Sequence, residues 1–197
     1  MSRGRLEAFS DGVIAVVITI MVLNLEPPHG SSLHDLRPLV PKLSVYLLSF
    51  VFIALYWNNH HHLLQAVDRV TGASLWANAH LLLWLSLTPA AAAWLGPHLT
   101  DGAPVAVYGV VLLGSAIAYW ILTHVLIAAH GPDSRLAQAI GRDVKGYLSV
   151  VAYVLAIAAA PFVPWLSIGL YVAVDVAWLV PDRRVERVLT PASRDSH

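Results

Sequence analysis

The chain has 197 residues, of which 57% are hydrophobic and 12% are charged, and its formal net charge is zero. Because a soluble domain is about a quarter charged, this composition predicts a membrane protein with several spans. The neutral net charge gives no electrostatic footprint for nucleic acid. The sequence contains no cysteine, which excludes disulfides, thiolate metal sites and a cysteine nucleophile.

Six apolar segments follow one another at residues 6–25, 39–64, 75–95, 105–129, 144–163 and 165–180. A segment that crosses lipid must be helical, because a helix satisfies its own backbone hydrogen bonds. Proline and glycine stand between the segments, at Pro27, Gly96, Gly131 and Pro164 among others. We therefore expect an all-α membrane protein with six transmembrane helices over residues 1–181. A short polar cytoplasmic tail is expected at 182–197.

The distribution of lysine and arginine predicts the orientation of these spans. If the crossings alternate, ten of the 12 basic residues fall on the side that holds both termini, and Arg37 and Lys42 fall on the other. Loops on the cytoplasmic side are enriched in Lys and Arg. Both termini are thus expected in the cytoplasm, in a multi-pass protein of a bacterial plasma membrane.

The first segment carries an apolar stripe with one hydroxyl. At helical spacing a single face holds Val16, Thr19, Ile20 and Leu23. Two interpretations of Thr19 are open. Its hydroxyl could donate to the backbone carbonyl one turn back, as in many membrane helices, or it could touch a permeating ion.

Polar side chains also collect where three segments reach the same membrane depth. The start of the first segment holds Arg5, Phe9, Ser10 and Asp11; the end of the second holds Trp57, Asn58 and His61; the start of the third holds Asn78. Ionisable groups are costly within a membrane and tend to face protein or water. A polar cluster between the three segments is one interpretation, and a simple capped helix start is the other.

The run His60-His61-His62 suggests metal binding by composition alone. Consecutive helical residues point about 100° apart, so one helix cannot direct all three at one ion, and His80 or His124 would have to complete a zinc or haem site. Three rival functions remain open: a histidine-dependent proton- or metal-coupled transporter, a haem or metal enzyme, and a structural membrane protein. No catalytic motif occurs, so we expect no enzyme. Asp175, in the last segment, has no evident partner.

The residues Arg5, Phe9, Ser10 and Asp11, followed by Ala15 and Thr19, resemble the signature of the transmembrane protein 175 family of potassium channels, R-x-x-x-F-S-D and then A-[apolar]-x-x-T. Further parts of the resemblance are Trp57 with His60 and His61, and Asn78 with Pro89 eleven residues later. Together with length and segment number, the resemblance covers nearly the whole chain.

The resemblance implies a potassium-permeable channel without a TVGYG carbonyl filter. It implies a homotetramer whose first helices line the pore, with Val16 at the constriction where other members carry isoleucine or leucine. Ile20 and Leu23 continue the lining, and K⁺ passes close to Thr19. It also implies that the polar residues of the first helix bind Trp57, His61 and Asn78. No cofactor or resident metal is implied; the partners are further copies of the chain and membrane lipid.

Overall fold

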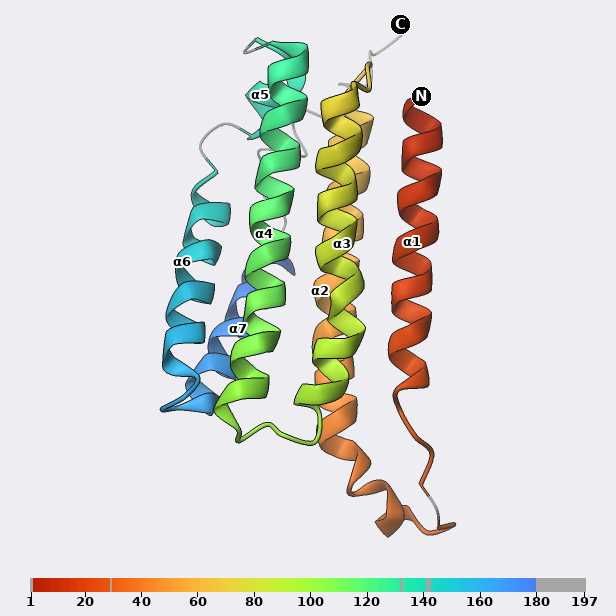
Figure 1. Cartoon of the computed structure of the whole chain (residues 1–197), viewed down its shortest axis with the longest axis vertical. Helices are drawn as coiled ribbons and strands as arrows, with labels where there is room; N and C mark the ends of the chain where they lie inside the picture. Colours follow the sequence, from red (N-terminus) through yellow and green to blue (C-terminus); the bar gives the residue numbers. More distant parts are fainter. Residues whose placement is uncertain (1, 29, 132, 141–142, 180–197) are drawn as a thin grey trace, which may run out of the picture.

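The fold is a bundle of long helices (Figure 1), and the computed structural model describes residues 2–28, 30–131, 133–140 and 143–179. Within these ranges there is no strand, and the elements are α1 (Arg3–Leu23), the 3₁₀-helix η1 (Leu33–Leu36), α2 (Leu39–Gln65), α3 (Gly72–Leu95), α4 (Gly102–His130), α5 (Arg135–Ile140), α6 (Val144–Ala159) and α7 (Pro164–Leu179). The six predicted segments correspond to α1, α2, α3, α4, α6 and α7, so the all-helical prediction is confirmed. The predicted tail at 182–197 lies outside the described residues.

Local sequence signals explain several helix ends. The Thr71 hydroxyl accepts the backbone N–H of Ser74 at 3.2 Å, which caps α3. The Asp143 carboxylate accepts the N–H of Gly146 at 2.8 Å and caps α6 in the same way. α4 ends at His130, and the following Gly131 has a φ of 92°, which glycine adopts readily but other residues adopt only at a cost. α6 ends at Ala159, four residues before the predicted end, because Pro161 cannot continue a helix.

The helices pack in an order that leaves α1 at one edge of the bundle (Figure 1). α1 packs against α3 and α2, α3 packs against α4, and α4 packs against α6; α7 closes the group against α6, α2 and α4. The face of α1 that meets its neighbours is buried and consists of Leu6, Ser10, Ile14, Val17 and Met21. The opposite face of α1 is exposed in the single chain although most of it is also apolar.

The long helices alternate in direction along the chain. The start of α1 and the end of α2 therefore lie at the same end of the bundle, where Arg3 Nη1 donates to the carbonyl of Gln65 at 3.3 Å. At the opposite end Lys42 Nζ lies 3.1 Å from Glu26 Oε2. This alternation is the premise of the predicted orientation; which end faces the cytoplasm stays a prediction.

Helix lengths differ between the two parts of the bundle. Of the described helices, α1, α2 and α4 are long and apolar enough to cross a membrane. α6 has 16 residues, or about 24 Å, against a hydrocarbon core of about 30 Å, and α7 is described as far as Leu179. The number of complete spans is therefore still a prediction.

Candidate functional site

A buried chain of hydrogen bonds joins α1, α2 and α3. Asn78 Nδ2 donates to Ser10 Oγ at 2.9 Å, and Asn78 Oδ1 lies 2.7 Å from His60 Nε2. Ser10 Oγ donates in turn to the carbonyl of Leu6 at 2.9 Å. Because the amide oxygen of Asn78 can only accept, His60 must carry its proton on Nε2. Ser10, Asn78 and His60 are at most 1% exposed, so this junction fixes how α1 is rotated against its neighbours.

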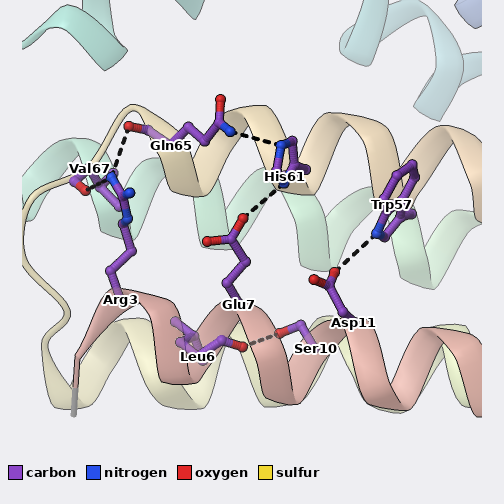
Figure 2. Close-up of polar contacts among 9 residues, drawn as sticks. All are labelled: Arg3, Leu6, Glu7, Ser10, Asp11, Trp57, His61, Gln65 and Val67. Atoms are coloured by element: carbon purple, nitrogen blue, oxygen red, sulfur yellow. Dashed lines mark hydrogen bonds and ion pairs between the residues drawn. The ribbon is translucent and has the colours of Figure 1, made fainter.

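A second set of contacts runs along the surface between α1 and α2 (Figure 2). Asp11 Oδ1 accepts the indole N–H of Trp57 at 3.0 Å, and Glu7 Oε1 lies 2.8 Å from His61 Nδ1. Gln65 Nε2 lies 2.8 Å from His61 Nε2. Since an amide nitrogen only donates, His61 Nε2 is the acceptor, and Nδ1 carries the proton that faces Glu7.

These contacts form two polar rows at i, i+4 spacing on antiparallel helices. The row on α1 is Arg3, Glu7 and Asp11, and the row on α2 is Gln65, His61 and Trp57. Each member faces its counterpart in the other row, Arg3 by way of the Gln65 backbone carbonyl (Figure 2). We call this arrangement the α1–α2 ladder. It sets the register of the two helices, as the buried junction sets their rotation.

The structure brings together most, but not all, of the polar residues chosen from the sequence. Ser10 and Asn78 belong to the buried junction, and Asp11, Trp57 and His61 belong to the ladder. Arg5 and Phe9 are exposed, and Arg5 has no hydrogen bond or ion pair with any residue in the described ranges. Sequence reasoning missed Arg3, Glu7 and Gln65, and it assigned His61 rather than His60 to the polar cluster. The i, i+4 spacing within each row was the available signal.

The apolar stripe of α1 faces away from the rest of the chain. Val16 is 55% exposed and Leu23 is 78% exposed, and Thr19 and Ile20 are also exposed. Thr19 Oγ1 donates to the carbonyl of Val16 at 2.8 Å, as one of the two interpretations of this residue expects. The hydroxyl proton is thereby directed at the backbone, which leaves the oxygen lone pairs free to meet a cation.

Beside this stripe, α1 and α3 enclose an apolar groove of about 780 Å³. Val16 and Ile20 border the groove, and several of its other lining residues are small: Ala8, Gly12, Ser86, Ala90 and Ala93. A Cβ placed on Gly12 would meet no atom of the chain within 4 Å. The groove is thus open to a second helix that approaches closely.

The histidines have separate partners. His60 binds Asn78 and His61 binds Glu7, whereas His80 Nε2 accepts the indole N–H of Trp84 at 3.0 Å. His124 Nδ1 lies 2.8 Å from the carbonyl of Trp120. In the part of the chain that the structure describes, no group of three or more His, Cys, Asp or Glu side chains is placed to hold a metal.

The apolar helices, the buried junction and the outward stripe define a multi-pass helical membrane protein. The chain belongs to the TMEM175 family. The family model for the endosomal/lysosomal potassium channel TMEM175 matches residues 5–89, which run from α1 into α3 and include the stripe and all of the ladder except Arg3. The predicted family is therefore confirmed.

The relatives include both short bacterial chains and longer animal proteins. A potassium channel of Chryseobacterium sp. (strain P1-3) is 51% identical over 189 residues, which cover 96% of this chain and 98% of that protein. The endosomal/lysosomal proton channel TMEM175 of Gallus gallus is 39% identical over 83 residues, 36% of this chain and 17% of that protein. The crystal structure of a lysosomal potassium-selective channel TMEM175 homolog from Chamaesiphon minutus aligns with a TM-score of 0.75 at 28% identity, over 95% of this chain and 98% of the other.

Proposed function

We propose that this chain forms a potassium-permeable cation channel of a bacterial plasma membrane, with passive K⁺ flux through a pore lined by α1. The observation that carries the proposal is the outward stripe of α1, where exposed apolar side chains flank one hydroxyl. A helix that is apolar on both faces must cover the second face with lipid or protein. The bacterial relatives named as potassium channels support a cover of protein, that is, α1 helices of further copies around a pore.

The pore requires several copies of the chain, and we propose a homotetramer. The groove between α1 and α3 supports this assembly, because small residues allow a helix of a neighbouring copy to approach closely. Val16 and Ile20 border the groove, so a helix that enters it lies beside the stripe. The helices α1, α2, α3, α4, α6 and α7 all cross the membrane in this proposal, with both termini in the cytoplasm.

The stripe provides a gate and a contact for the ion. A ring of Val16 side chains excludes water when it is narrow, and a small rotation of α1 rewets it. Thr19, one turn further along, offers oxygen lone pairs to a partly dehydrated K⁺, because its proton is held by the Val16 carbonyl. Ile20 and Leu23 continue the lining. The buried junction and the ladder hold α1 in the rotation that directs this face to the axis.

The test is K⁺ flux into liposomes that contain the purified protein. We expect Val16→Asn to raise the flux, since a polar ring stays wet, and Thr19→Ala to change the preference for K⁺ over Na⁺. Val176→Asn is the matched control, because Val176 is 54% exposed on α7, close to the 55% of Val16. Unchanged flux and selectivity in both α1 variants would refute the pore assignment.

The same assay separates the channel from a histidine-dependent carrier. A carrier would lose transport entirely with His61→Ala or His80→Ala. The channel is expected to keep passive flux in His80→Ala, because His80 is bound to Trp84 and lies outside the stripe.

A further inference from the structure

A second cavity lies away from α1, between α2, α4, α6 and α7. Its volume is about 320 Å³, within the range of small-molecule sites. Seven of the described lining side chains are aromatic, among them Tyr56, Tyr119, Tyr153 and Trp178. Two carboxylates, Asp143 and Asp175, also line it, and no basic side chain is among the described lining residues. The cavity is therefore both aromatic and acidic.

Asp175 is the polar group that needs an explanation. Its side chain lies on α7, lines the cavity and is 5% exposed. No hydrogen bond or ion pair reaches its carboxylate from any residue in the described ranges. An ionised carboxylate that is buried without a partner is costly, and within a membrane domain such a group marks a functional site. A cation in the cavity would supply the missing partner.

The aromatic side chains around the carboxylate are held in fixed positions. The rings of Tyr56 and Tyr119 meet edge to face with centroids 5.8 Å apart, and the Tyr119 hydroxyl donates to the Asn59 carbonyl at 3.2 Å. The indole N–H of Trp178 donates to Ser149 Oγ at 2.9 Å. These contacts prevent the rings from collapsing into the space.

One ring already attracts a cation from the chain itself. Lys145 Nζ lies 5.4 Å from the centroid of Trp178, a distance at which an ammonium group is attracted to an indole face. Lys145 forms no ion pair with Asp175, because the ion pairs that join two described residues within 4.0 Å are Lys42–Glu26 and His61–Glu7. The other carboxylate, that of Asp143, accepts the Gly146 N–H. Of the two carboxylates that line the cavity, only that of Asp175 has no partner among the described residues, so it is available to a ligand.

We propose that this cavity binds a small organic ammonium cation, with the charge beside Asp175 and the alkyl groups against the aromatic faces. Aromatic rings beside a desolvated carboxylate favour the binding of alkylated ammonium groups, because these cations are weakly hydrated. A divalent metal ion fits less well, because Ca²⁺ and Mg²⁺ need about six or more oxygen ligands. Trp120 of α4 and Tyr147 of α6 line the cavity and are 51% and 70% exposed, so we place its entrance between these two helices.

Isothermal titration of the purified full chain with choline chloride tests this proposal, with sodium chloride at equal ionic strength as the blank. We expect saturable binding of one choline per chain. The uncharged analogue, in which carbon replaces the ammonium nitrogen, should bind at least about tenfold more weakly. Asp175→Asn should lower the affinity for choline by a similar factor. Asp68→Asn makes the same change at an exposed position outside the cavity and should have no effect.

Three results would overturn the proposal: no saturable choline binding by the wild-type protein, equal binding of the uncharged analogue, or unchanged binding in Asp175→Asn. The last would place choline elsewhere, including the pore. If Asp175→Asn does not fold, Trp120→Leu replaces it. Trp120 is half exposed at the entrance, and its loss should weaken choline binding severalfold while the uncharged analogue is unaffected. The titration measures binding directly and does not depend on K⁺ conduction.

Discussion

The buried junction between the first three helices gives a quantitative prediction. Asn78→Leu keeps the side-chain size but removes the acceptor of the His60 Nε2 proton and the donor to Ser10. Ser10 keeps its bond to the Leu6 carbonyl, so it loses only one interaction. His60 loses its partner altogether, because its Nδ1 atom is already buried without one in the described structure.

The expected cost follows from these two losses. A stranded buried donor costs about 1–3 kcal/mol and a lost neutral hydrogen bond about 1 kcal/mol. Asn78→Leu should therefore lower the free energy of unfolding by about 2–4 kcal/mol. Because replacing both partners by apolar groups can be nearly neutral, adding His60→Phe should recover part of this loss. The coupling between the two changes should be about 0.5–3 kcal/mol.

Unfolding in mixed micelles titrated with sodium dodecyl sulfate, followed by tryptophan fluorescence, measures all four members of this cycle. His62→Phe, at an exposed position of the same helix, is the control for placing a phenylalanine there. A double variant whose destabilisation equals the sum of the two single ones would show that Asn78 and His60 are not coupled. The junction would then not hold the three helices as described.

Three glycines lead to further predictions of different kinds. A Cβ on Gly114 would overlap the Trp84 ring, so Gly114→Ala should destabilise the α3–α4 contact by about 1–3 kcal/mol in the same dodecyl sulfate titration. Gly169→Ala, with open space around it, should be neutral or stabilising in that titration. Gly12 lies in the α1–α3 groove and has free space in the single chain, so Gly12→Leu should leave the chain folded but prevent assembly. Crosslinking of the solubilised protein should then show monomers for Gly12→Leu and four-chain species for Gly169→Leu; tetramers in both would contradict the role of the groove.

The fold was largely predictable because long apolar runs separated by proline and glycine leave few alternatives in lipid. α5 was missed because six residues make less than two turns, too few for a periodic pattern. The predicted end of α6 was wrong because the apolar composition continues past Pro161 although the helix does not. Composition indicates how far a segment stays apolar, and backbone chemistry decides how far it stays helical.

The sequence was enough to predict the membrane depth of the site residues, but not which of them would contact one another. Equal membrane depth was enough to associate Ser10 and Asp11 with Trp57 and Asn78. It could not decide between His60 and His61, since neighbouring helical residues point about 100° apart and packing sets the rotation of α2. The structure gives both histidines a role, His60 in the buried junction and His61 in the ladder.

The shortness of α6 has a consequence for the surrounding lipid. In the proposed tetramer with α1 at the axis, α6 lies on the side of each subunit away from α1 (Figure 1). Its 16 residues fall about 6 Å short of a typical hydrocarbon thickness, and each ångström of such a mismatch costs a fraction of a kcal/mol. If this tetramer forms, the bilayer should thin around its perimeter, and shorter acyl chains should gather there.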